Sequence, residues 1–213
     1  MSQVNTFIFD IDGTLIDSFD MYMPSMIEIL RRHGYEIAPE DEDTIMKKYF
    51  GITGLDALKL FGVKPEEIEL IHDEWVVESD KRRDFTKALD QIPEALDALS
   101  KVPGNRLAVA TSKLRDEYEY FEKQYDFAKH FEVAIASEDT EKHKPSPDPI
   151  LAALDRMGVK PENAVYVGDT INDLLAAKAA GVKFAGANYG SVNPSEIKDA
   201  DYLLDSPMDL LKI

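Results

Sequence analysis

Short uninterrupted runs of apolar residues recur along the chain, and each predicts one strand of a buried sheet. The first run lies in residues 4–9 and contains Phe7-Ile8-Phe9, which is typical of a strand covered on both faces. It ends at the polar segment 10–14. Similar runs predict further strands at residues 106–110, 132–136, 164–167, 182–185 and 202–204.

Amphipathic segments lie between these later runs, and their apolar residues recur every three or four positions, which predicts helices. The predicted helices span residues 93–101, 114–127, 148–157, 171–180 and 208–211, with Gly181 ending the fourth. Strands that alternate with helices require crossover connections, which produce a parallel sheet. We therefore expect an α/β fold with a Rossmann-like parallel-sheet core that includes the first strand.

Residues 17–84 interrupt this alternation, because helical spacing continues there without a comparable strand. Helices are predicted at residues 21–33, 40–50, 55–61 and 65–79, with Gly34 ending the first and Pro65 opening the last. The charged run 80–84 has the character of an exit linker. The sequence thus predicts an all-α domain, residues 17–84, inserted into a core domain of residues 1–16 and 85–213.

Charge and composition narrow the classes of function. The 213 residues include 24 Lys and Arg against 41 Asp and Glu, so the net charge is −17. Such a surface repels nucleic-acid phosphates and anionic lipid head groups, so we expect no nucleic-acid or membrane partner. An anionic small substrate would need local positive charge from Lys or a metal ion. The absence of Cys excludes disulfides, thiolate catalysis and thiolate zinc sites.

The N-terminal sequence and the lengths of the apolar runs indicate the cellular compartment. Residues 1–10 show no basic segment followed by a long apolar one, and no run approaches the ~18 apolar residues of a membrane span. A chain without Cys also suits a reducing compartment. We therefore expect a cytoplasmic protein.

Polar residues follow the ends of the predicted strands, which is where ligands bind in an open parallel sheet. The candidates are Asp10 and Asp12, Thr111 and Ser112, Lys144 within segment 142–149, and Asp169 and Asp173. Carboxylates that gather at one edge repel each other unless a cation lies between them. A site with few protein oxygen ligands favours Mg²⁺, because this ion keeps several waters and bridges to phosphate. The pattern therefore predicts a magnesium site.

Each of these residues also has a purely structural interpretation. An Asp after a strand commonly caps a helix, Ser and Thr commonly begin one, and a lone Lys is normally solvated. The combination Asp10-x-Asp12-Gly13-Thr14 is more specific, because two carboxylates two positions apart at a strand end point to the same side. Likewise, a hydroxyl with backbone N–H groups at a helix start, as at residues 111–113, can bind phosphate oxygens.

Together these segments resemble the motifs of the haloacid dehalogenase superfamily, in its phosphatase branch. The four motifs occur in the family's order: D-I-D-G-T at 10–14, Thr111, Lys144 in K-P-S-P-D-P, and G-D-T-I-N-D at 168–173. The resemblance covers nearly the whole chain. The helical insert is similar to the small cap of the group that contains phosphoglycolate phosphatase, pyrophosphatase and β-phosphoglucomutase.

The resemblance implies a mechanism and a ligand set. Asp10 would be the nucleophile and form an aspartyl-phosphate, while Asp12 would protonate the leaving alcohol and then deprotonate water. Mg²⁺ would be held by a carboxylate oxygen of Asp10, the backbone carbonyl of Asp12, and Asp169. Asp173 would orient either a water on the metal or Lys144. Lys144 would neutralise the nucleophile and the phosphoryl oxygens.

The resemblance also implies how substrate is held. Thr111 and N–H groups near Ser112 and Lys113 would bind the phosphoryl oxygens, and the cap would close over this edge and select the leaving group. Residues 50–54, with Gly51 and Thr53, form a candidate specificity loop, and an ordinary helix connection is the equal alternative. The implied partner is a small phosphorylated metabolite, and the expected state is a monomer or weak homodimer.

Three functions stay open on the sequence. The first is a Mg²⁺-dependent phosphatase for a phosphoglycolate-like ester, or for pyrophosphate. The second is a sugar phosphomutase, although familiar mutases of this group place a His and a Glu where this chain has Tyr22 and Gly168. The third is a non-catalytic phosphate-binding regulator on the same scaffold.

Overall fold

In the computed structural model, which describes residues 4–213, the chain divides into two compact units. One contains the residues up to Ile16 together with Ala88–Ile213, and the other is Asp17–Lys87. We call these the core unit and the inserted unit.

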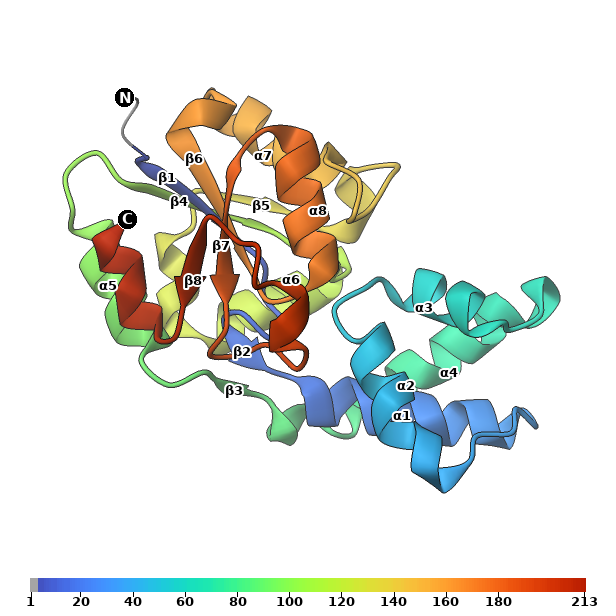
Figure 1. Ribbon diagram of the computed structural model, residues 1–213. Helices are drawn as coiled ribbons and strands as arrows, with labels where there is room; N and C mark the ends of the chain where they lie inside the picture. Colours follow the sequence, from blue (N-terminus) through green and yellow to red (C-terminus); the bar gives the residue numbers. More distant parts are fainter. Residues whose placement is uncertain (1–3) are drawn as a thin grey trace. The chain divides into compact units, whose positions relative to one another are not determined.

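The core unit is built on a parallel sheet (Figure 1). Its strands are β1 (Thr6–Phe9), β4 (Arg106–Ala110), β5 (Val133–Ile135), β6 (Ala164–Gly168), β7 (Lys183–Ala187) and β8 (Tyr202–Leu204). They lie in the order β5-β4-β1-β6-β7-β8, and each neighbouring pair is parallel. The prediction of an α/β fold with a parallel sheet is confirmed, including the place of the first strand in it.

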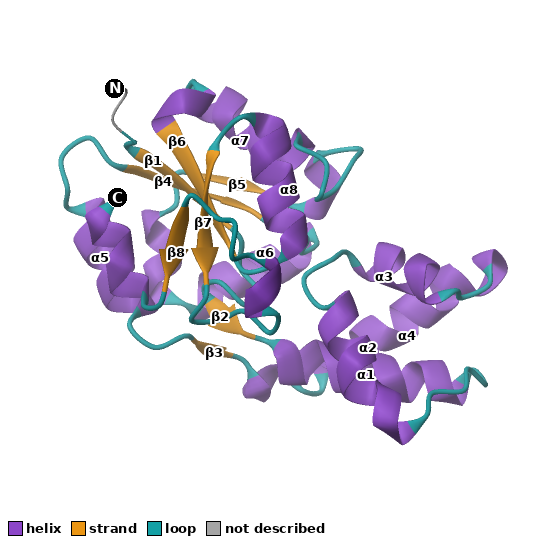
Figure 2. Ribbon diagram, in the orientation of Figure 1, coloured by secondary structure: helices purple, strands orange, loops and turns teal. Residues whose placement is uncertain are grey.

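Helices cover both faces of this sheet (Figure 2). They are α5 (Ile92–Ser100), α6 (Arg115–Gln124), α7 (Asp148–Met157) and α8 (Ile171–Ala180). Because strand side chains alternate between faces, Phe7 packs in a cluster with residues of α5 and α6, whereas Ile8 and Tyr166 pack in a cluster with residues of α7 and α8. Each such large apolar side chain, once buried, stabilises the fold by about 1.5–3 kcal/mol, so a strand covered on both faces is apolar without interruption.

The inserted unit is helical, as the periodicity predicts. Its α-helices are α1 (Phe19–Arg32), α2 (Glu42–Tyr49), α3 (Gly54–Phe61) and α4 (Ile68–Asp80). Within the unit, the buried Trp75 indole donates a hydrogen bond to the Tyr22 carbonyl at 2.9 Å, which ties α4 to α1. Two short strands, β2 (Ile16–Asp17) and β3 (Lys87–Ala88), pair where the chain passes between the two units.

Several predicted helices begin or continue as 3₁₀ turns. The 3₁₀ segments are Pro39–Asp41, Pro65–Glu67, Arg83–Phe85, Asp126–His130, Ser137–Asp139, Pro161–Asn163, Pro194–Glu196 and Pro207–Lys212. Many start with proline, whose fixed φ suits a first helical turn. The predicted helix 208–211 is part of a 3₁₀ segment, and the predicted helix 114–127 divides into α6 and a 3₁₀ turn.

Strand β1 lies at the point where the order of the strands reverses. Its neighbours are β4 on one side and β6 on the other, so the carboxyl ends of β1, β4 and β6 lie side by side. Ligand sites of open α/β sheets form at this kind of switch point. Among the described residues, no helix has the length and apolar character required to cross a membrane.

Candidate active site

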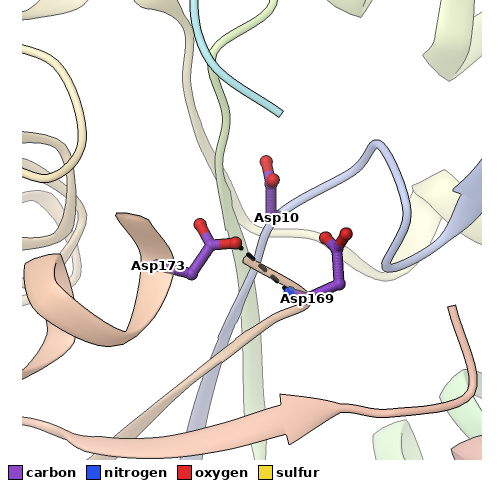
Figure 3. Close-up of side chains that lie close together, drawn as sticks. All are labelled: Asp10, Asp169 and Asp173. Carbon is purple, nitrogen blue, oxygen red and sulfur yellow. Dashed lines mark hydrogen bonds between the residues drawn. The ribbon is translucent and has the colours of Figure 1, made fainter. Parts of the chain in front are cut away.

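Three buried carboxylates converge at the carboxyl ends of β1 and β6 (Figure 3). Asp10 follows β1, Asp169 follows β6, and Asp173 lies in the first turn of α8. One oxygen of each lies within 4.8 Å of one oxygen of each of the others. The backbone fixes this convergence, because the Asp10 N–H donates to the Val167 carbonyl at 2.9 Å and thereby continues the β1–β6 ladder past the strand end.

Lys144 supplies positive charge to this cluster. Its ammonium lies 2.9 Å from Oδ2 of Asp10 and 2.8 Å from Oδ1 of Asp173, and its side chain is 1% exposed. It also donates to the hydroxyl oxygen of Tyr166 at 3.1 Å. An ammonium has three N–H groups, so each of them has an acceptor within the protein.

The two oxygens of Asp173 are both engaged by protein donors. Oδ1 faces Lys144, and Oδ2 accepts from the N–H groups of Asp169 and Thr170 at 3.2 and 3.0 Å and from the Thr170 hydroxyl at 2.7 Å. Of the two roles that the sequence left open for Asp173, this geometry favours orienting Lys144. Gly168 is required beside it, because a Cβ on Gly168 would lie 2.5 Å from Cβ of Asp173.

Asp10 and Asp169 each keep one carboxylate oxygen without a hydrogen-bond partner in the described part of the chain, residues 4–213. Oδ1 of Asp10 and Oδ2 of Asp169 are buried and have no hydrogen-bond partner among the described residues. Leaving a buried carboxylate oxygen unsatisfied is costly unless a ligand completes it. One oxygen of each carboxylate lies within 4.8 Å of one oxygen of the other, and hard oxygens at this spacing suit a divalent cation such as Mg²⁺, so the residues present fit the ion that the sequence predicts.

Burial and the neighbouring charges change the pKa values of the cluster. Burial raises the pKa of Asp10 from 3.8 to about 7, with Lys144 opposing the shift and Asp173 and Asp12 adding to it. Burial likewise raises the pKa of Asp169 well above its usual range. For Lys144, burial alone lowers the pKa, but Asp10 and Asp173 outweigh it, so its pKa lies well above the usual value and the ammonium stays charged.

Residues of two loops position Asp169. The Thr14 hydroxyl donates to its Oδ1 at 2.9 Å, and the Ser191 hydroxyl donates to its backbone carbonyl at 2.6 Å. Tyr189 in turn donates its hydroxyl to the Thr14 carbonyl at 3.1 Å. Gly190 lets the second loop approach, because a Cβ there would lie 2.0 Å from the Gly13 carbonyl oxygen.

Asp12 and Thr111 belong to a second group on the same unit. The Lys113 ammonium lies 2.9 Å from Oδ1 of Asp12, and the side chains of Lys113 and Asp12 are 6% and 14% exposed. The Lys113 N–H donates to the Thr111 hydroxyl at 3.2 Å, which fixes the turn after β4. Ser112, between Thr111 and Lys113 in the sequence, is partly exposed. The structure therefore gathers all the candidates of the core unit into two adjoining groups, one around Lys144 and one around Lys113.

Gly51 and Thr53 lie in the inserted unit. Gly51 has a φ of +81°, which glycine adopts without strain. The Thr53 hydroxyl accepts from the Asp56 N–H at 3.3 Å and donates to the Asp56 carboxylate at 2.7 Å, so it caps α3. A capping role accounts for Thr53 within its own unit, and its part in substrate recognition stays a prediction.

Tyr166, Tyr189 and Ser191 take part in the site but were not identified from the sequence. Tyr166 carried the clearest signal, because a phenol within the otherwise apolar run Ala-Val-Tyr-Val-Gly must find a buried partner for its hydroxyl. The loop 187–193 carried none, since Asn, Tyr, Gly and Ser after a strand are typical of any turn.

Comparison with known proteins gives consistent matches along the chain. A family model described as haloacid dehalogenase-like hydrolase matches residues 7–187. A protein of Caldanaerobacter subterraneus subsp. tengcongensis, named "Putative pyrophosphatase PpaX", is 35% identical over 99% of this chain and 94% of its own length. Phosphoglycolate phosphatase of Aquifex aeolicus is 33% identical over 97% of this chain and 94% of its own. The crystal structure of a hydrolase from Pseudomonas syringae superposes with a TM-score of 0.85 at 26% identity, covering 100% of this chain and 97% of that one.

Proposed function

The chain belongs to the haloacid dehalogenase-like hydrolases, and on that premise we propose that it hydrolyses a small phosphoglycolate-like phosphate monoester through an aspartyl-phosphate on Asp10. The observation that carries the proposal is the Asp10 carboxylate, which is buried, is held at one oxygen by Lys144 and has no partner among the described residues at the other. We propose that it acts in the cytoplasm, as a monomer or weak homodimer.

In the first step, Asp10 attacks phosphorus. The new bond joins a carboxylate oxygen of Asp10 to phosphorus, and the bond from phosphorus to the leaving oxygen breaks. Asp12 gives its proton to that oxygen, so the product leaves as an alcohol. Lys144 lies 2.9 Å from Asp10 and reduces the repulsion between the carboxylate and the phosphoryl oxygens.

In the second step, water takes the phosphoryl group from Asp10. Asp12, now ionised, accepts a proton from the water as its oxygen bonds to phosphorus, and the bond between phosphorus and Asp10 breaks to give inorganic phosphate. Thr111 and the N–H groups near Ser112 and Lys113 hold the phosphoryl oxygens in both steps. Spontaneous hydrolysis of phosphate monoesters is among the slowest reactions known, with enzymatic accelerations up to about 10²¹, so preorganised charge must supply most of the effect.

Asp10, the backbone carbonyl of Asp12, and Asp169 would hold Mg²⁺. The ion, when bound, supplies positive charge to the phosphoryl oxygens and to the nucleophile. The unpartnered oxygens of Asp10 and Asp169 support this assignment. Asp173, whose oxygens already have protein donors, would position Lys144. The inserted unit would act as the cap that selects the leaving group, with residues 50–54 as its specificity loop.

Inorganic pyrophosphate is the second candidate substrate. The relative that is 35% identical carries a pyrophosphatase name, while the relative that is 33% identical is named a phosphoglycolate phosphatase. Both substrates present a phosphoryl group to the same nucleophile, so the core chemistry is shared. A phosphomutase is disfavoured, because this chain has Tyr22 and Gly168 where familiar mutases of the group place a His and a Glu.

Phosphate release from purified protein tests the proposal. With Mg²⁺, the wild type should hydrolyse p-nitrophenyl phosphate, and a panel that includes phosphoglycolate and pyrophosphate should rank phosphoglycolate first. Asp10→Asn should lower kcat at least about a thousandfold, because the nucleophile is removed. Asp155→Asn, an exposed carboxylate on α7, serves as the matched control and should keep wild-type turnover.

The outcomes of these assays distinguish the candidate functions. Faster release from pyrophosphate than from phosphoglycolate would favour the second candidate. Formation of an isomeric sugar phosphate without phosphate release would favour a mutase. Absence of turnover in the wild type across the panel would favour a non-catalytic regulator, and substantial turnover by Asp10→Asn would refute the assignment of the nucleophile.

A further inference from the structure

Tyr166 is a polar residue in the centre of the sheet. It lies in the middle of β6, which pairs with β1 and β7, and its side chain is 0% exposed. It is the largest of the fully buried side chains, and it packs in the cluster shared with α7 and α8. A phenylalanine would fill the same volume without burying a hydroxyl, so packing alone does not explain the phenol.

The Tyr166 hydroxyl connects two parts of the site. It donates to the Ala110 carbonyl at 2.7 Å, at the last residue of β4 and directly before Thr111. Its oxygen accepts from the Lys144 ammonium at 3.1 Å, and that ammonium also lies 5.6 Å from the centre of the ring. The phenol thus links Lys144 to the strand end that carries the candidate phosphate-binding turn.

The contacts of Lys144 show what this link does. Asp10 and Asp173 each take one N–H of the ammonium, and Tyr166 takes the third. Without the phenol oxygen, one buried N–H would have no acceptor, and the ammonium would move toward the two carboxylates. Among the described residues, Oδ1 of Asp10 is an unsatisfied acceptor in this cluster, and it lies on the carboxylate whose other oxygen the ammonium already contacts. An ammonium bridging both oxygens of Asp10 would occupy the oxygen that the native arrangement leaves open for a ligand.

We propose that Tyr166 is a positioning residue for Lys144: its hydroxyl holds the ammonium on one oxygen of Asp10 and keeps the other available. The effect on turnover rests on the proposed function. The effect on the ammonium does not, because it is a property of the protein without substrate. The two can therefore be measured separately.

The first measurement follows the ammonium of Lys144 in Tyr166→Phe. With ¹⁵N-labelled lysine, the buried ammonium should give its own NMR signal, assigned by its loss in Lys144→Gln. In Tyr166→Phe that signal should shift, and its hydrogens should exchange with water about tenfold faster, because one of three hydrogen bonds is lost. An unchanged signal and exchange rate would overturn the proposal, whatever the kinetics.

The second measurement compares kinetics with p-nitrophenyl phosphate and Mg²⁺. Tyr166→Phe should lower kcat about tenfold and leave KM within about twofold, since the nucleophile is affected and phosphate contacts are kept. The matched control is Tyr202→Phe, which removes another phenol that accepts from a lysine, Lys183 at 3.0 Å, at the β7–β8 edge. It should keep wild-type kcat.

Each combination of results has one meaning. A moved ammonium with reduced kcat supports the proposal. A moved ammonium with wild-type kcat in Tyr166→Phe overturns the role in the reaction. If the wild type itself shows no turnover on the panel of phosphate esters, the proposed function fails, and the NMR result alone decides whether Tyr166 positions Lys144. Circular dichroism melting of each variant confirms that the compared proteins are folded.

Discussion

Position 13 needs a positive φ and has no room for a Cβ atom, and only glycine satisfies both requirements. Its φ of +74° lies in the left-handed region, where a side chain is strained, and a Cβ would lie 2.3 Å from Oδ2 of Asp169. That oxygen is one of the two carboxylate oxygens of the site that lack a hydrogen-bond partner among the described residues. The glycine of the D-I-D-G-T motif therefore provides both the turn after β1 and the space that the Asp169 carboxylate occupies.

Gly13→Ala should consequently damage stability and ion binding together. The expected loss in the free energy of unfolding is about 1–3 kcal/mol, measured by urea denaturation, and calorimetric titration should show weaker Mg²⁺ binding. Gly158→Ala is the matched control, because Gly158 has a φ of +64° but nothing within 4 Å of the position that a methyl group would take. It should lose about 1 kcal/mol and bind Mg²⁺ normally. Equal Mg²⁺ affinity in both variants would contradict this role of Gly13.

At the scale of elements, the first turn of α8 joins helix capping to the site. The Thr170 hydroxyl accepts from the Asp173 N–H at 3.3 Å and donates to Oδ2 of Asp173 at 2.7 Å. The same Asp173 holds Lys144 with its other oxygen. A single capping box therefore sets both the start of the helix and the orientation of a carboxylate that the site uses.

Thr170→Ala should lower stability by about 1 kcal/mol and kcat by about threefold to tenfold, because Asp173 loses one of its donors. Ser206→Ala provides the comparison, since Ser206 caps the C-terminal 3₁₀ segment through a similar box with Asp209. It should lose comparable stability, measured by thermal melting, and keep full turnover. Loss of turnover in both variants would mean that stability alone explains the effect.

The sequence predicts elements better than it predicts contacts. Helices 148–157 and 171–180 lie where the apolar spacing places them, because amphipathic periodicity over ten residues is a strong signal. Strands β2 and β3 are missed, since two residues are too few for a pattern. The convergence of Asp10 and Asp169 follows from parallel topology, whereas the Asp12–Lys113 pair depends on side-chain packing that no spacing encodes.

For the molecule as a whole, the buried cluster should make stability depend on pH and on a divalent ion. The pKa of Asp10 is about 7 in the folded protein, against 3.8 ordinarily. The folded protein therefore binds this proton more tightly than the unfolded chain does. The corresponding stability is fully present below about pH 4 and is lost as the pH rises through 7. The raised pKa of Asp169 acts in the same direction.

With a chelator present to remove divalent ions, the loss of this Asp10-linked stability should lower the melting temperature of the wild type, relative to that of Asp10→Asn, as the pH rises from about 4 to 8. Mg²⁺ should reverse the fall, and at a concentration about 100 times its Kd it should add about 2.7 kcal/mol of stability at pH 8. Its effect should be smaller at pH 5, where protons compete for the same oxygens. A Mg²⁺ effect that is equal at both pH values would argue against binding at Asp10.

The pairing of β2 with β3 means that the chain leaves the core unit and returns to it through adjacent segments. The fold of the six-stranded sheet therefore depends little on the segment between β2 and β3. A longer, shorter or differently folded segment could connect these two strands without shifting the strands that carry the carboxylates. If the proposed function holds, substrate preference and phosphoryl chemistry are encoded in separable stretches of the gene, and exchanging the inserted unit should change the first and leave the second in place.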